Sequence, residues 1–457
     1  SEIDNAPDYT AAALFKIAAG HNSQVDLDNF TSLINVATSY LQHEKFQQAF
    51  LSEKGSLDDL TTILESSYTR FDNESNLNET EDAKALAGMR TSLNQVLADI
   101  SALSKFKEIC AVSSIFSDTL QKWLHSPSSK SQLQVCACIM LGNLARHDTT
   151  CIEFVQSSRL HKPLIAILSR DSSSQVLHAA LGFLKNLAIP QENKNIIGEA
   201  EIFPVLSRLW ALDTMPQVKL SAVTLGRLLT IGTYENVHRL IFQDTNKEET
   251  NFSLLINLFS STDDEPIKME VARLSTSICR VLYSQIESFW EKKEFSRKAF
   301  FLMHPEICHQ FSFLICQNKW PAVRSEVWFV LALTARFPDG AEFVSCILKD
   351  VKVFGLLVEL LTKTTAAANL DASSTPPLND AAVTQTHISS EPVNPHSHAK
   401  NVVQADRENA LVLISEILKS SGSEITPLLR TELRDLIKVA GGLYLNSKQK
   451  NFEANCE

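Results

Sequence analysis

Asparagine and arginine side chains recur at a regular spacing in the middle of this 457-residue chain. Asn143 lies in the string IMLGNLARHD, Asn186 follows 43 positions later in GFLKNLAIPQ, and Arg227 lies 41 positions further on in VTLGRLLTIG. A carboxamide both donates and accepts hydrogen bonds, and a guanidinium donates in a fixed fork that matches carboxylates. A row of such side chains is suited to holding another polypeptide by its backbone and its acidic groups. The chemistry that this pattern predicts is recognition rather than the making of bonds.

The sequence offers little for catalysis or for metal binding. It contains no GxxxxGK[ST], GxGxxG, GxSxG or HExxH string. His147, Asp148 and His309 are expected at helix ends, where polar residues are common, and we predict no catalytic role for them. Nine cysteines occur without a CxxC pair, and His396 and His398 stand in a polar stretch, so no metal site is predicted. We therefore expect a protein that is not an enzyme, has no cofactor and keeps its cysteines as reduced core thiols.

The element that must position Asn143 and its equivalents is a long helix inside a repeat of about 42 residues. Apolar runs that begin with proline recur as well, since Pro163-Leu-Ile-Ala-Ile-Leu and Pro204-Val-Leu-Ser-Arg-Leu lie 41 residues apart. Only helical patterns occur within the period, which is typical of HEAT and armadillo solenoids. We predict an all-α fold, namely an armadillo-repeat right-handed superhelical solenoid.

Three segments are predicted along the chain. Armadillo repeats are expected over residues 1–361. Residues 362–401 are rich in Ala, Ser, Thr and Pro and carry few apolar side chains, so we expect a disordered, low-complexity insertion there. Helical periodicity returns in 402–457, which we predict to be a C-terminal armadillo repeat or cap. The best-marked long helices are expected to begin near Gln132, Gln175, Gln217, Pro266 and Pro321.

One face of the long helices remains after the apolar stripes are assigned to the core, and we expect it to line a concave groove. Five aligned copies give 20 such positions, which include six Lys or Arg, one His and no Asp or Glu. The groove is therefore predicted to be basic and polar. For the asparagines a second interpretation stays open, in which their amides satisfy backbone groups of neighbouring repeats. The candidate partner-binding residues are Asn143, Arg146, His178, Asn186, Lys219, Arg227, Arg273 and Ser277.

The formal net charge of −11 is concentrated near the start of the chain. Residues 1–120 hold 18 Asp and Glu against 8 Lys and Arg, whereas the remaining 337 residues hold 35 against 34. A field of this sign repels nucleic acid and anionic lipid and attracts a basic partner. Solubility is the other explanation of the acidic residues, and both stay open. Because no apolar run is long enough to span a bilayer and no signal peptide is visible, we expect a cytoplasmic monomer that binds no nucleic acid and does not insert into membranes.

Two strings carry a resemblance to a known family. The first, which runs from Asn143 to Ile152, fits the pattern N-[IL]-A-R-x-D-x-x-C-I, and the second, which runs from His178 to Pro190, fits H-A-A-L-x-x-L-x-N-L-A-I-P. The chain resembles the armadillo-type GDP-dissociation stimulators of small GTPases, the SmgGDS family, clearly over about 130–235 and more faintly to about 420. The insertion and the weakly matched N-terminal repeats depart from the family pattern, as in a divergent, fungal-like member.

The resemblance implies a cytosolic, chaperone-like exchange factor for Rho- and Rap-type GTPases with basic, prenylated tails. In that family the armadillo groove holds the GTPase and loosens its nucleotide pocket, and another part of the rod accommodates the lipidated tail. A basic groove would suit the acidic switch surface of a GTPase, and the acidic first quarter would suit a basic tail. Phe15, Leu33, Phe46 and Phe50 are candidates for a prenyl slot, with ordinary core positions as the alternative. The alternative function is an armadillo scaffold or adaptor for another protein partner, without exchange activity.

Overall fold

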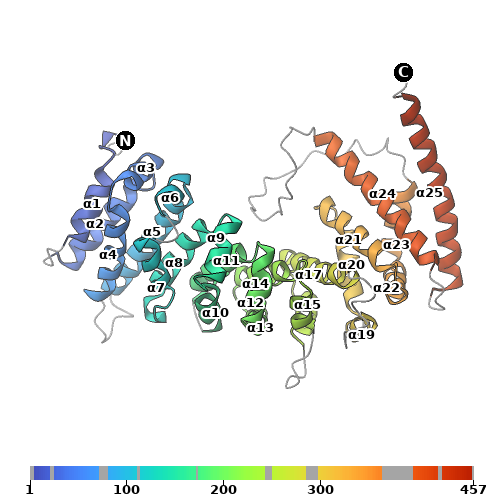
Figure 1. Cartoon of the computed structure of the whole chain (residues 1–457), viewed down its shortest axis with the longest axis horizontal. Coiled ribbons are helices and arrows are strands. Elements are labelled where there is room, and N and C mark those ends of the chain that lie inside the picture. The colour runs from blue at the N-terminus through green and yellow to red at the C-terminus, as the bar shows by residue number, and fades with distance from the viewer. Residues whose placement is uncertain are drawn as a thin grey trace. The chain divides into compact units, whose positions relative to one another are not determined.

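The structure, a computed structural model, describes residues 5–20, 25–71, 81–110, 114–170, 173–241, 250–284, 297–362, 395–419 and 425–454. Within these ranges every regular element is a helix, so the predicted all-α fold is confirmed. The chain forms two compact units, unit 1 (Ser1–Asp244) and unit 2 (Thr245–Glu457). Both units are stacks of helical repeats (Figure 1).

Unit 1 is organised by its long helices, each of which packs on the long helix of the next repeat. These long helices are α2 (Leu27–Tyr40), α5 (Glu81–Ala102), α8 (Ser131–Leu144), α11 (Ser174–Leu187) and α14 (Pro216–Thr230). Two shorter helices lie between consecutive long ones and complete each repeat. The shorter helices of unit 1 are α1 (Thr10–Ala19), α3 (Glu44–Ser52), α4 (Ser56–Thr69), α6 (Ser104–Ile109), α7 (Ile115–Trp123), α9 (Asp148–Gln156), α10 (His161–Ser169), α12 (Gln191–Glu199), α13 (Ile202–Trp210) and α15 (Tyr234–Ile241), with a short 3-10 turn at Ser128–Lys130.

Unit 2 continues the pattern with α17 (Glu265–Ser284), α21 (Pro321–Thr334) and α24 (Pro395–Lys419), which pack on one another in that order. Its other helices are α16 (Asn251–Ser261), α19 (Arg297–Met303), α20 (Ile307–Cys316), α22 (Pro338–Leu348), α23 (Val351–Thr362) and α25 (Pro427–Ala454). The starts predicted for the five best-marked long helices all fall within one residue of the observed starts of α8, α11, α14, α17 and α21. The repeat read from the sequence is therefore confirmed.

The edges of the predicted insertion differ from the structure. α23 runs to Thr362, and α24 begins at Pro395, inside the stretch 362–401 in which no structure was expected. Proline is favourable in the first turn of a helix because an N–H group at that position would have no intrahelical partner. Few apolar residues follow it, so the periodicity gives no sign of this helix start. Residues 363–394 lie outside the described residues.

A recurring contact closes the turn between a long helix and the short helix that follows it, after α2, α8, α11 and α14. The last carbonyl groups of an α-helix have no intrahelical donor and need another partner. Asn193 Nδ2 donates to the Leu187 carbonyl oxygen at 2.9 Å, and Asn236 Nδ2 donates to that of Leu229 at 2.9 Å. The equivalent contacts elsewhere in unit 1 are made by the side chains of Gln47 to Leu41 and of Cys151 to Ala145.

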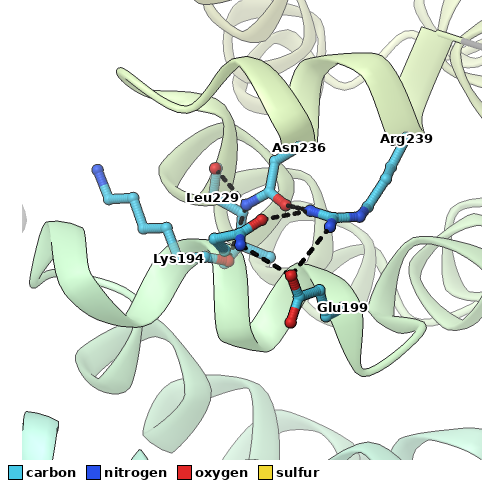
Figure 2. A network of polar contacts seen from close by, with 6 residues as sticks. Lys194, Glu199, Leu229, Asn236 and Arg239 are labelled. Atoms are coloured by element: carbon cyan, nitrogen blue, oxygen red, sulfur yellow. Dashed lines mark hydrogen bonds and ion pairs between the residues drawn. The ribbon is translucent and has the colours of Figure 1, made fainter.

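The same asparagines also tie one repeat to the one before it. Asn193 Nδ2 donates to the Cys151 carbonyl oxygen at 2.9 Å, and Asn236 Nδ2 donates to the Lys194 carbonyl oxygen at 2.8 Å, in both cases 42 residues back along the chain. Both side chains are fully buried. Figure 2 shows the Asn236 amide between the Leu229 and Lys194 backbones. One carboxamide therefore fixes both the turn within a repeat and the stacking between repeats.

Asn193 lies six residues after the end of α11. In unit 2 the residue at the same position after α21 is a glycine, Gly340. A Cβ atom on Gly340 would lie 2.0 Å from the carbonyl oxygen of Thr334, six residues earlier. Real Cβ atoms do not approach a backbone oxygen so closely, because the two atoms would overlap. The absence of a side chain at Gly340 therefore lets α22 pack directly on the end of α21.

We expect Gly340→Ala to destabilise unit 2 by about 1–3 kcal/mol, because the new methyl group displaces the end of α21. Gly355→Ala in α23 is the matched control, since a Cβ there meets nothing within 4 Å. Alanine at that exposed helix position is expected to add up to about 1 kcal/mol of stability. Urea unfolding followed by circular dichroism measures both variants, and equal stability of the two would contradict this account of the turn.

Candidate functional site

The two predicted asparagines of the long helices hold neighbouring repeats together. Asn143 Nδ2 donates to Ser101 Oγ at 2.8 Å and, with a longer contact of 3.3 Å, to the carbonyl oxygen of Ala98 on α5. Asn186 Nδ2 donates to the carbonyl oxygen of Gly142 on α8 at 2.8 Å. Both side chains are half-buried. The second interpretation of these residues, as partners of the preceding repeat, is therefore confirmed for their amide nitrogens.

Three other predicted residues lie on the exposed side of the long helices of unit 1. Arg146 follows α8 and is exposed, His178 on α11 is exposed, and Lys219 on α14 is half-buried. Arg146 Nη2 donates to Asn143 Oδ1 at 2.8 Å. Among the described residues neither Arg146 nor Lys219 has a carboxylate within ion-pair distance. We call Arg146, His178 and Lys219 the basic set of unit 1.

His178 differs from the other two residues of the basic set in its protonation. Although much of the side chain is exposed, partial burial of the ring, followed by the positive charge of Lys185, lowers the pKa of His178 below its ordinary value. The ring is therefore biased towards its neutral form near pH 7, in which it both donates and accepts a hydrogen bond. Fixed positive charge in the basic set comes from Arg146 and Lys219.

Arg227 was predicted to face a partner, but the structure buries it, with 6% of its surface exposed. α12 and α15 both pack against α14, the helix that carries Arg227. Its charge acts on Lys194 of α12, whose Nζ donates to the Ile231 carbonyl oxygen at 3.0 Å. Burial, and then the charge of Arg227, lowers the pKa of Lys194 to about 8. A partner therefore reaches Arg227 only by displacing the interior of unit 1.

The two predicted residues of unit 2 are also used internally. Arg273 Nη1 lies 3.1 Å from Glu270 Oε2, and Glu270 is buried. Ser277 is 7% exposed, and its hydroxyl group donates to the Arg273 carbonyl oxygen at 3.1 Å. The predicted groove positions include no carboxylate, because Glu270 lies one turn before Arg273 on the same helix and is not itself one of those positions. The charge of Arg273 is thus balanced within α17.

Sequence reasoning missed Asn193 and Asn236, although a signal was present. Glu-Asn pairs, Glu192-Asn193 and Glu235-Asn236, recur 43 residues apart. Figure 2 shows how Arg239 extends the second of these contacts, with Arg239 Nη1 2.7 Å from Asn236 Oδ1 and Nη2 3.6 Å from Glu199 Oε1. These residues organise the stack of repeats in unit 1.

The groups considered for chemistry in the sequence are dispersed. His147 and Asp148 are exposed at the start of α9, and His309 is exposed on α20. In the part of the chain that the structure describes, no group of three or more His, Cys, Asp or Glu side chains could hold a metal ion. The side chains of His396 and His398 lie outside that part. None of the described helices combines the length and the apolar character needed to cross a membrane.

The aromatic residues considered for a prenyl slot are core residues of unit 1. Phe15, Phe46 and Phe50 are each at most 1% exposed, and the rings of Phe15 and Phe50 meet edge to face at 5.4 Å. Leu33 is half-buried on α2. The core alternative for the three phenylalanines is therefore the one that the structure supports.

Three-helix repeats of about 42 residues, stacked through their long helices, define this chain as an armadillo-repeat protein. Rap1 GTPase-GDP dissociation stimulator 1-B of Xenopus laevis is 31% identical over 170 residues, which are 36% of this chain and 26% of that protein. The protein named GTPase-GDP dissociation stimulator vimar of Drosophila melanogaster is 27% identical over 165 residues, which are 35% of this chain and 25% of that protein. The chain thus spans about a quarter of the length of the curated relatives it matches.

These relatives are of the kind that the two sequence strings indicated, so the resemblance to GDP-dissociation stimulators is confirmed. No protein-family model matches the chain. Among solved structures, an engineered protein is 17% identical with a TM-score of 0.47, covering 95% of each chain. The designed armadillo repeat protein YIII(Dq)4CqI is 17% identical with a TM-score of 0.42, covering 59% of this chain and 99% of that one.

The buried Lys194 predicts a pH dependence of stability in unit 1. Its folded pKa of about 8 lies below the value near 10.4 of an unfolded lysine, so between these values the unfolded state binds more protons. The contribution of Lys194 to stability is therefore least favourable below pH 8 and rises as the pH increases towards 10. Relative to a Lys194→Met variant, we expect the wild type to gain roughly 1–3 kcal/mol across this window.

Chemical unfolding at pH 7 and at pH 10 measures this difference. Lys54→Met is the control, because Lys54 is exposed and its replacement should change stability equally at both pH values. A difference between wild type and Lys194→Met that stays constant with pH would contradict the assignment.

Proposed function

We propose that this protein binds a small GTPase through the exposed side of the long helices of unit 1 and promotes the release of GDP. The observation that carries the proposal is the 31% identity over 170 residues to a protein named for GDP dissociation from Rap1. The basic set of unit 1 supports it, because Arg146 and Lys219 present positive charge that no described carboxylate of the chain balances. Such charge attracts an acidic surface on a partner and increases the rate of encounter.

Release of GDP requires no catalytic group on this chain. A protein that binds the nucleotide-free GTPase more tightly than the GDP-bound form lowers the affinity of the GTPase for GDP by the same factor. A rigid surface that fits only one of the two conformations is sufficient for this effect. The stack of unit 1 supplies rigidity through its buried asparagines and their contacts 42 residues back.

The finer parts of the proposal concern the identity of the GTPase. We expect Rho- and Rap-type GTPases, and a chaperone-like role for those with basic, prenylated tails. Residues 1–120 contain 18 acidic and 8 basic residues. Their negative net charge supports an attraction between this part of the chain and a basic tail. Such an attraction falls with ionic strength, because the Debye length is about 10 Å at 0.1 M salt.

The experiment that tests the proposal is the release of a fluorescent GDP analogue from purified Rap1- and Rho-type GTPases. Each GTPase is used intact and without its C-terminal tail, at low and at moderate salt. Faster release supports exchange, and an effect that needs the tail and fades with salt supports the acidic end as its docking site. A stable complex without faster release would replace exchange by a scaffold or chaperone function, and the absence of any complex would refute GTPase binding.

The variants that test the surface are chosen from residues that are exposed or half-buried. Asn186 and Arg227 are unsuitable, because their replacement disturbs contacts inside the stack. We expect Arg146→Glu combined with Lys219→Glu to weaken the GTPase complex at least about tenfold, since two attractive charges become repulsive. Isothermal titration with nucleotide-free GTPase that lacks its C-terminal tail measures the affinity, so that the acidic residues 1–120 do not contribute through the tail.

Lys54→Glu combined with Lys107→Glu is the matched control for this surface. It makes the same change in net charge at a different part of unit 1, and neither lysine is in contact with a described carboxylate. Circular dichroism must show unchanged helicity in both double variants. If the Arg146 and Lys219 variant binds with wild-type affinity, or if the control loses as much affinity, the GTPase does not bind at the basic set of unit 1.

A further inference from the structure

A cleft of about 480 Å³ opens in unit 1 between α7 and the start of α10. Figure 1 shows α7, α10 and α13 along the lower edge of unit 1, below the long helices. The cleft is lined on one side by Lys122 at the end of α7 and by His125, and on the other side by Arg159 and Lys162. Three lysine and arginine side chains and a histidine thus converge on one depression.

The positive charges that line the cleft outnumber the carboxylates among its described lining residues. Lys122, Arg159 and Lys162 are exposed, and none of them forms an ion pair with a described residue. Asp118 is the one carboxylate among the described residues that line the cleft. Like charges held close together without a counter-ion repel one another, so an anion in the cleft would lower the energy of the arrangement.

The backbone of the cleft does not require an arginine. Arg159 has a φ of 55°, in the left-handed region that most residues avoid. The turn before α13 contains a left-handed residue too, and there it is Glu201, with a φ of 60°. Because a residue of opposite charge adopts the same conformation one repeat later, the geometry of the turn does not explain the charge of Arg159.

A neighbouring buried residue responds to the same positive field. His161, the first residue of α10, is 2% exposed. Burial, followed by the charges of Lys162 and Arg159, lowers the pKa of His161. The nearby cations are therefore close enough to act on a group inside the protein.

Size and charge together define what this cleft accepts. Its volume exceeds that of a single phosphate group, and the buried side chains of Leu160 and Pro163 give it an apolar floor. An extended polyanion, such as nucleic acid or an anionic membrane, would also lie near residues 1–120. The negative net charge of these residues would repel it. A compact anionic group on a short stretch of polypeptide avoids that repulsion.

We propose that the cleft between α7 and α10 binds a compact acidic segment of a partner protein, whose carboxylate or phosphorylated side chains contact Lys122, Arg159 and Lys162. Guanidinium and ammonium groups make charge-assisted hydrogen bonds to such anions. The proposed GTPase surface lies on α8, α11 and α14, so this is a second binding site on different helices. It does not depend on whether a GTPase is bound.

The test is fluorescence anisotropy with the full chain and a short fluorescein-labelled peptide of aspartate, glutamate and phosphoserine. A peptide of the same length with asparagine, glutamine and serine at those positions is the neutral comparison. We expect the acidic peptide to bind and the neutral one not to bind. Lys122→Glu combined with Arg159→Glu should weaken binding at least about tenfold, because contacts to charged groups are lost and repulsion replaces them.

The folding of this variant is favoured by the precedent of Glu201 at a left-handed position. Lys54→Glu combined with Lys107→Glu again serves as the charge-matched control and should retain wild-type affinity. Equal affinity for both peptides, or an equal loss in the control, would overturn the proposal. Displacement of the acidic peptide by an equimolar amount of inorganic pyrophosphate would also overturn it, because the cleft would then be a site for free phosphate compounds.

Discussion

The structure depends on the buried carboxamides that satisfy the ends of its helices. A long helix ends with carbonyl groups that lack intrahelical donors, and a stack of helices buries many such ends. Asn193 and Asn236 each donate to a carbonyl of the preceding long helix and to another 42 residues back. An unpaired buried carbonyl costs about 1–3 kcal/mol, and the contacts to Leu187 and Leu229 avoid that cost at the ends of α11 and α14. These residues recur along the chain at the spacing of the repeats. The same contact therefore fixes the end of a long helix and the packing of one repeat on the next.

The stack of long helices could be predicted from the sequence, because each long helix is buried along one side by its neighbours. That burial imposes a 3.6-residue period that survives changes of individual residues, and it located five helix starts within one residue. α24 shows the limit of this signal. Its first turns contain few apolar residues, so the sequence there shows no apolar period that would mark the start of the helix.

The partner-facing side was predicted less well, for a physical reason that Arg227 illustrates. The apolar periodicity of a helix identifies the side that faces the core. It does not show which part of the opposite side is covered by a third helix. α12 and α15 pack against α14, and Arg227, the residue aligned with Asn186, is interior. Arg273 is a different case, since it pairs with a carboxylate one turn away on its own helix. Such contacts of the short helices, and the neighbours on the same helix, vary from repeat to repeat and decide which positions a partner can reach.

Rigidity and recognition are linked in an armadillo stack that acts on a switching partner. To lower the affinity of a GTPase for GDP a hundredfold, a binding protein must distinguish two conformations by about 2.7 kcal/mol. One or two charge-assisted hydrogen bonds provide an energy of that size, provided that they form with only one conformation. A flexible surface would follow the partner through both conformations and lose the distinction. The contacts that hold α8, α11 and α14 at fixed spacing, which are those of Asn143, Asn186, Asn193 and Asn236, therefore bear on the proposed binding, although the amide nitrogens of these residues are used inside the stack. In such a protein the residues inside the stack hold the binding surface in one conformation, and the exposed charges make the contacts that distinguish the conformations of the partner.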